Sequence, residues 1–173
     1  FYPEVINQVG QERPILSQLS ESYLYKDLFM LSNAIKRPEL LEKILQALAY
    51  QVGHEVSHNE IAQLVNSDNE TVGRYIDLLI KSYVIFPLYS FSRNLRNEIK
   101  TNRKYYFFDN GIRNAVIGNF NAVANRNDIG ALWENFLVSE RKKRNAYSGA
   151  YGRSYFWRTT SQQEIDFLEE YDG

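Results

Sequence analysis

Two acidic side chains in the last third of the chain are the first candidates for chemistry. Glu134 falls in a helical pattern, at the margin of the apolar face that Leu137 and Val138 form. Asp166 alternates with apolar neighbours in a strand pattern and points away from their face. A helix glutamate and a strand aspartate that face each other could share a divalent cation, because Mg²⁺ prefers carboxylate oxygens. Such pairs also arise by chance in mixed folds, so spacing alone favours two unrelated carboxylates.

A second set of candidates is cationic. The segment 93–104 contains five cations and one glutamate, a local charge of +4. A loop of this kind can lie along DNA phosphates without reading sequence, or it can be solvated and pair with an acidic neighbour. In the helical segment before it, two side chains could reach base edges, but nearby carboxylates repel phosphate, so packing against another domain is the favoured role. The predicted nucleic-acid contacts are Asn69, Arg74, Arg93, Arg96, Lys100, Arg103 and Lys104.

The elements that must position these residues follow from the periodicity of apolar side chains. Helical patterns run over 15–31, 38–53, 57–65 and 67–80, and β-rich stretches follow at 83–89 and 104–109. Three helices and then a two-stranded ribbon are the element order of a winged helix-turn-helix. A further helical piece at 110–117, an Asn- and Gly-rich linker, a helix at 129–143 and strands at 155–158 and 163–168 complete the chain.

Local signals refine these elements. Ser57 with Glu60, and Ser67 with Glu70, are candidate capping boxes for two of the helices. Pro87 has no backbone N–H, which argues for an edge position or a bulge in the first strand. The basic run at 141–144 is expected to lie in the last turn of its helix, where cations suit the helix dipole.

The two ends of the chain predict a fragment of a longer protein. The chain starts at Phe1 without an initiator methionine and ends on Asp172-Gly173, a strong hairpin-turn signal with no returning strand. The strand at 163–169 is therefore expected to be an exposed apolar edge, which invites pairing with a second copy of the chain.

Composition limits the remaining classes. The chain has 173 residues, enough for one domain or two small ones, and a net charge of −1 gives no overall attraction to nucleic acid or anionic membranes. The absence of cysteine excludes disulfides and thiolate sites and fits a cytoplasmic protein. No apolar run reaches the roughly 18–20 residues that span a bilayer, so no membrane partner is expected.

Several separated strings resemble one family. They are similar to a group of bacterial and archaeal AAA-type ATPases whose C-terminal portion is known only as domain of unknown function 4143. The resemblance covers nearly the whole chain. The matching strings are Tyr23–Asp27, Ser90–Arg96, Tyr106–Gly111, Gly130–Glu140, Tyr155–Thr159 and Gln163–Asp166.

The resemblance implies a domain organisation. Residues 1–37 would be the tail or connection of a missing ATPase module, 38–117 a winged helix domain, 118–128 a linker, and 129–173 a truncated restriction-endonuclease-like domain of the PD-(D/E)xK class. The ATPase module carries a phosphate-binding loop, and no G-x-x-x-x-G-K-[ST] string occurs in this chain. The expected fold class is therefore α+β, with a mainly helical N-terminal part and a truncated α/β nuclease-like part.

The resemblance also assigns roles. Glu134 and Asp166 match the acidic catalytic positions of the nuclease fold, but the Glu-x-Lys pair belongs on a following strand, so this chain should be inactive. It should need no cofactor, whereas the full-length protein could use ATP and a divalent cation such as Mg²⁺. The expected function is that of a winged helix that binds DNA or docks on its own ATPase module. A non-catalytic protein–protein interaction module and a nuclease at full length are the alternatives.

Overall fold

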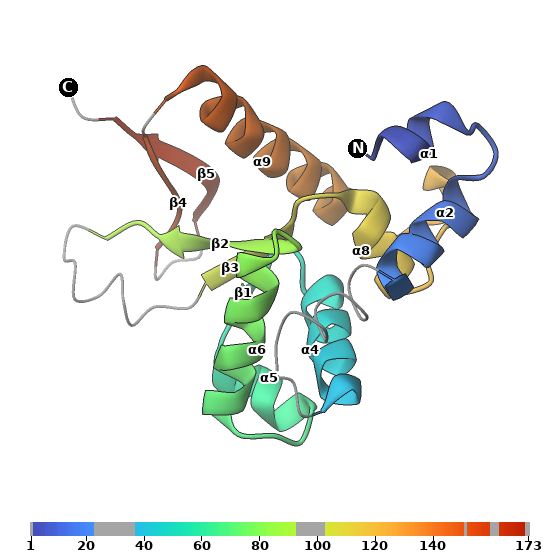
Figure 1. Ribbon diagram of the computed structural model, residues 1–173. Coiled ribbons are helices and arrows are strands. Elements are labelled where there is room, and N and C mark those ends of the chain that lie inside the picture. Colours follow the sequence, from blue (N-terminus) through green and yellow to red (C-terminus); the bar gives the residue numbers. More distant parts are fainter. Residues whose placement is uncertain (1, 23–36, 93–102, 151, 160–162, 172–173) are drawn as a thin grey trace.

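A computed structural model describes residues 2–22, 37–92, 103–150, 152–159 and 163–171 of the chain (Figure 1). It confirms the α+β class, with helices around a mixed five-stranded sheet. In chain order the elements are α1 (Pro3–Asn7), α2 (Glu12–Leu19), α4 (Pro38–Tyr50), β1 (Glu55–Val56), α5 (His58–Leu64), α6 (Asn69–Lys81), β2 (Ile85–Ser90), β3 (Arg103–Phe107), α8 (Asn110–Val116), the 3₁₀ turn η2 (Val123–Asn125), α9 (Ile129–Ser148), β4 (Arg153–Arg158) and β5 (Glu164–Glu170).

The sheet connects the early and the late parts of the chain. Its strand order is β1-β3-β2-β4-β5, and all neighbours are antiparallel except β2 and β4, which are parallel. In Figure 1, α4, α5 and α6 lie below the strands and α9 lies above them. Strands from before and after the expected linker at 118–128 therefore belong to one sheet, and β5 forms one of its edges.

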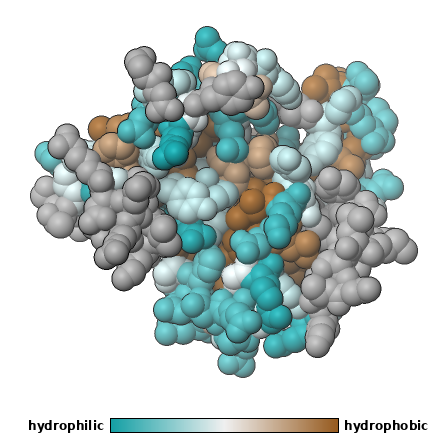
Figure 2. Space-filling model, turned by 60° about the vertical axis from the view of Figure 1, so that its left-hand side comes forward, coloured by the Kyte–Doolittle hydropathy of each residue, from teal (hydrophilic) through white to brown (hydrophobic). Residues whose placement is uncertain are grey.

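The core lies where helix α4 packs against α5, α6 and α8, and it continues into buried residues of β2 and β3. The apolar positions of α4 recur at helical spacing, and Leu41, Ile44, Leu45 and Leu48 are fully buried. Burying a side chain of this size contributes about 1.5–3 kcal/mol, so this stripe fixes α4 in place. On the face in Figure 2, apolar side chains gather near the middle, among hydrophilic ones.

Pro87 lies in an inner strand and not at an edge, contrary to the expectation from its missing N–H. Phe108 donates to the Val84 carbonyl on the β3 side, and Phe91 donates to the Phe156 carbonyl on the β4 side. Even-numbered residues of β2 therefore bond to β3, while the nitrogen of Pro87 faces β4. Since β4 pairs with β2 only at Tyr89 and Ser90, no ladder bond is lost at Pro87.

The helix ends agree with the sequence in part. Ser57 accepts a hydrogen bond from the Glu60 N–H, as expected for a cap. At α6 the cap is Asp68, which accepts from the Thr71 N–H at 2.7 Å, and not Ser67. An aspartate in the cap position serves as well as a serine, so the two choices were not distinguishable from residue type.

Helix α9 is longer than expected. It runs to Ser148 and ends at Gly149, which takes the left-handed conformation that favours glycine. The basic run at 141–144 therefore lies within the helix and not in its last turn. Arg141 instead binds Glu169 on β5.

Some expectations fall on residues that the structure does not describe. Residues 23–36, which include part of the helix expected over 15–31, lie outside the described residues, as do Asp172 and Gly173. Within the described part of the chain, no helix combines the length and the apolar character needed to cross a bilayer.

Candidate functional site

A buried lysine lies among three carboxylates where β3, α9 and β5 meet. The Lys104 ammonium nitrogen is 2.6 Å from an oxygen of Glu164, 3.2 Å from Asp166 and 3.3 Å from Glu134. The Lys104 side chain is only 2% exposed, whereas that of Asp166 is 60% exposed. We call these four residues the Lys104 cluster.

Strand alternation and helix placement bring the cluster together. Glu164 and Asp166 are two residues apart in β5, so both point to the same face of the sheet. In β3, Lys104 and Tyr106 share a face for the same reason. Glu134 comes from the second turn of α9, which packs on β3. Three elements distant in sequence therefore each supply at least one charged group.

Glu134 has two further neighbours. The Tyr106 hydroxyl donates to Glu134 Oε1 at 2.6 Å. Burial and this carboxylate both raise the pKa of Tyr106, so the phenol stays neutral and acts as a donor. Gly53, three residues after α4, has a positive φ of 80°, and a Cβ there would lie 3.1 Å from Glu134 Oε2. A larger residue at Gly53 would be strained and would crowd the carboxylate.

The charges of the cluster decide what it can do. Burial acts to lower the pKa of Lys104, but the hydrogen bond with Glu164 and the charges of all three carboxylates outweigh burial, so the pKa is raised. The ammonium is therefore positively charged and occupies the point on which the carboxylates converge. A divalent cation at that point would be repelled by the lysine. In line with this, the described residues contain no group of three or more acidic, His or Cys side chains arranged to hold a metal. The arrangement does not fit a metal ion, and its chemistry is that of a buried ion cluster that joins three elements.

The structure places the predicted site residues in different surroundings. Glu134 and Asp166 come together, with Lys104 between them. Lys104 lies in this cluster and not on a surface open to phosphate. Arg103, one residue earlier, lies on the opposite face, with its guanidinium 5.2 Å from the centre of the Tyr89 ring.

The other predicted nucleic-acid contacts divide into two groups. Asn69 and Arg74 are exposed on α6, and Arg74 donates to the Thr71 hydroxyl at 3.0 Å. Arg93, Arg96 and Lys100 lie outside the described residues.

Two members of the site, Glu164 and Tyr106, were not predicted. Glu164 lies two residues before the predicted Asp166 in β5, and Tyr106 lies two residues after the predicted Lys104 in β3. Alternation alone could have placed them on the same faces. Nothing in the sequence pairs β3 with α9, so the partners could not be inferred.

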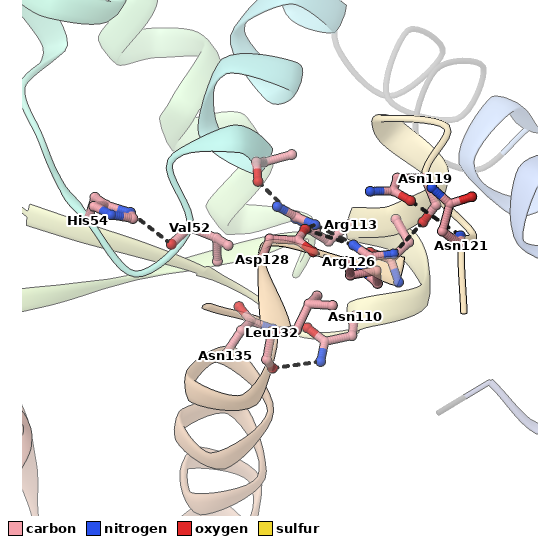
Figure 3. A network of polar contacts seen from close by, with 12 residues as sticks. Val52, His54, Asn110, Arg113, Asn119, Asn121, Arg126, Asp128, Leu132 and Asn135 are labelled. Carbon is pink, nitrogen blue, oxygen red and sulfur yellow. Dashed lines mark hydrogen bonds and ion pairs between the residues drawn. The ribbon is translucent and has the colours of Figure 1, made fainter. Parts of the chain in front are cut away.

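A second polar network holds the segment expected to be a linker (Figure 3). The guanidinium of Arg113, buried on α8, donates to the Ala49 carbonyl and binds Asp128. Arg126 donates to both Asp128 oxygens, at 2.7 and 2.8 Å, and to the Asn119 carbonyl at 2.7 Å. The segment before α9 is thus anchored to α8 and to the end of α4.

Asn135 of α9 bonds to the backbone of β3 as a neighbouring strand would. Its side-chain oxygen accepts from the Phe107 N–H at 2.7 Å, and its amide donates to the Phe107 carbonyl at 3.0 Å and to Asn110 Oδ1 at 2.7 Å. Asn110 in turn donates to the Leu132 carbonyl at 2.9 Å (Figure 3). Asn135 is almost completely buried, so α9 is fixed to β3 by directional bonds.

Acid should destabilise the protein through two of its carboxylates. The hydrogen bond from Arg126, with help from Arg113, lowers the pKa of Asp128 to about 2, and the hydrogen bond from Arg141 lowers the pKa of Glu169 to about 2. Because both values lie below those of the unfolded chain, the stability they provide is present above about pH 4.5 and is lost as the pH falls toward about 2. The loss should be on the order of 2 kcal/mol for each group.

The effect is measured by urea unfolding across this pH range, with tryptophan fluorescence as the readout. The double variant Asp128→Asn with Glu169→Gln should start less stable and should depend less on pH. An equal slope of stability against pH in both proteins would contradict the assignment.

Two family models match the chain, each over a different segment. The family described as "Domain of unknown function (DUF8612)" matches residues 1–123, and "Domain of unknown function (DUF4143)" matches residues 129–173. No solved structure matches significantly.

The curated relatives carry no functional description. An uncharacterized protein of Haemophilus influenzae is 29% identical over 160 residues, which are 89% of this chain and 36% of that protein. The uncharacterized proteins Mb2031c of Mycobacterium bovis and Rv2008c of Mycobacterium tuberculosis are each 27% identical over 154 residues, 88% of this chain and 34% of theirs. The chain spans about a third of the length of these relatives.

Proposed function

The chain belongs to the DUF8612 family, and from this premise and the geometry of its site we propose that it is a rigid, non-catalytic docking region of an AAA-type ATPase. The ATPase context is supported by the motif strings that the chain shares with that group. It is also supported by relatives about three times as long, which have room for a nucleotide-binding module.

The observation that carries the proposal is the Lys104 cluster. It ties β3 to α9 and β5 through a buried ammonium, and the pairing of β2 with β4 extends the connection through the sheet. Breaking this contact would leave a buried charge without its partner. The part of the chain that ends with β3 and the part that contains α9 and β5 should therefore move as one body. A rigid body of this kind suits a region that transmits position and does not suit a hinge.

The same cluster gives Glu134 and Asp166 a role that needs no metal ion. In a nuclease these carboxylates would have to bind a metal, whereas here they hold Lys104. We therefore assign them a structural role, in which they join α9 and β5 to β3.

The helical part supports a winged helix interpretation. Helices α4, α5 and α6 are followed by the antiparallel strands β2 and β3, with the short β1 paired to β3. In such a unit α6 would be the helix offered to a partner. Its exposed first half carries Arg74 and Glu70, and Asp68 caps it, so these three residues have a net charge of −1. This balance favours a protein partner over DNA.

Helix α9 offers the apolar surface for docking. Ile129, Trp133 and Leu137 recur every four residues along it, and they are 42%, 60% and 48% exposed. A stripe of this kind matches the apolar face that one helix presents to another. We propose that the protein's own ATPase module packs against this stripe.

Association with the ATPase module tests the proposal. The chain and the separately produced N-terminal remainder of the same protein should bind with one-to-one stoichiometry by calorimetry. Trp133→Ser should weaken binding by about tenfold or more, because large exposed aromatics dominate interface energies. Tyr50→Ser is the matched control, since Tyr50 is an exposed aromatic on α4.

The outcomes separate the candidate functions. Absence of association, or equal weakening by both variants, would contradict docking through α9. Titration of the same chain with duplex DNA examines the alternative partner. Binding to DNA that weakens steeply as salt increases, together with no binding to the ATPase module, would favour the DNA role.

A further inference from the structure

A cavity opens in the sheet where β2 and β4 separate. Its volume is about 550 Å³, within the range of small-molecule sites. The two strands pair only at Tyr89–Tyr155 and Ser90–Phe156, so their earlier residues diverge and leave a gap. The described lining residues are Phe86, Pro87, Leu88, Tyr89, Arg103, Lys142, Gly152, Arg153, Ser154, Tyr155 and Phe167.

The charged residues among the described lining of the cavity are all cations. Among its described lining residues are three cations, Arg103, Lys142 and Arg153, and no carboxylate. Arg153 lies opposite Glu170 in the pairing of β4 with β5, so its charge is partly balanced. Arg103 and Lys142 therefore make the cavity attractive to an anion.

These two cations approach the gap from opposite faces of the sheet. Arg103 lies over the Tyr89 ring at 5.2 Å, on the face away from α9. Lys142 of α9 lies over the Phe86 ring at 5.1 Å. Contact with an aromatic ring face stabilises each cation at the rim of the gap. Burial lowers the pKa of Lys142, and a bound anion would offset that cost.

The backbone adds a hydrogen-bond acceptor. Phe108 donates to Val84 on the β3 side, so the carbonyl of Pro87, three residues later, points to the β4 side and into the gap. An amino group on a flat ring inserted between the strands could donate to it.

We propose that this cavity binds a nucleotide, whose phosphate is held by Arg103 and Lys142 and whose base lies against the rings of Tyr89 and Phe167, which are not fully buried. The cations match the phosphate, the aromatic rings match the face of the base, and the backbone acceptor matches an amino group on the base. The site is distinct from the Lys104 cluster and does not depend on docking through α9. The nucleotide is either free or a unit of a single strand of nucleic acid, since both present the same chemistry.

Calorimetric titration of the whole chain with adenosine monophosphate tests the proposal. Binding should be saturable, and inorganic phosphate, which lacks the base, should bind about tenfold or more weakly. Lys142→Met and Arg103→Met should each weaken nucleotide binding by about tenfold or more, the loss expected for one charge-assisted hydrogen bond. Arg144→Met is the matched control, because Arg144 lies on the same helix outside the cavity lining.

Each outcome bears on the site. Absence of saturable binding, or equal binding by the two cavity variants and the wild type, would overturn the proposal. A single-stranded oligonucleotide distinguishes the source of the nucleotide: tighter binding than that of adenosine monophosphate, lost in the same two variants, would identify a nucleic-acid strand. Weaker binding of the oligonucleotide would identify a free nucleotide. Circular dichroism of each variant confirms that it is folded.

Discussion

Replacing Lys104 by methionine should lower the free energy of unfolding by about 3 kcal/mol, which is near the lower end of the cost of removing one partner from a buried ion pair. Methionine keeps most of the apolar stem but leaves three carboxylates facing each other without the ammonium. The loss is placed at the lower end because Asp166 is largely exposed, so water can solvate part of the remaining charge. Urea or thermal unfolding measures the change.

Lys43→Met provides the matched comparison. Lys43 is an exposed lysine on α4, and its replacement should change stability by no more than about 0.5 kcal/mol. If Lys104→Met were as harmless as Lys43→Met, the ammonium would not be holding the three elements together. The effect of Lys104→Met should also persist in high salt, since a buried ion pair is screened much less than a surface pair.

The second large effect is expected at Asn135. Asn135→Ala should lower the free energy of unfolding by about 2–3 kcal/mol, because it leaves the buried N–H and carbonyl groups of Phe107 without partners. Hydrogen exchange provides a local readout, since the Phe107 amide should lose protection as the contact between α9 and β3 opens.

Asn121→Ala is the control for this variant. Asn121 is exposed after α8, and its side chain can be removed without uncovering a buried backbone group. Unchanged protection at Phe107 in Asn135→Ala would contradict the assigned bonds. Equal destabilisation by both variants would show that the cost is unrelated to β3.

Local elements could be predicted from the sequence because short-range physics determines them. The apolar stripe of α4 and the Ser57 cap follow from side chains three or four residues apart, and both appear as expected. The end of α9 was misplaced because the basic run at 141–144 resembles a last turn. Its Arg141 instead pairs with a residue 28 positions later.

The candidate site could be predicted only in part. Glu134 and Asp166 were identified by residue type, but the cation between them, Lys104, was grouped with its basic neighbours along the chain. Strand alternation sends Arg103 and Lys104 to opposite faces, so a basic run in a strand cannot form a single patch. The carboxylates that hold Lys104 are 30 to 62 residues away, a separation over which sequence pattern gives no pairing.

The network at Asp128 illustrates the same limit. The Asn- and Gly-rich composition of 118–128 correctly indicated an irregular connection. It gave no sign that Arg113 and Arg126 would both bind one aspartate. The composition of a loop indicates its backbone conformation. The ion pairs that hold it depend on which helices it contacts in the fold, and composition does not indicate those.

A double-mutant cycle between Lys104 and Glu164 tests the central claim most directly. The Lys104 ammonium and a Glu164 oxygen are 2.6 Å apart. Unfolding free energies of the wild type, Lys104→Met, Glu164→Gln and the double variant should give a coupling of about 1 kcal/mol or more, as found for residues in direct contact. Additive losses, within about 0.5 kcal/mol, would contradict a buried ion cluster that joins β3 to β5.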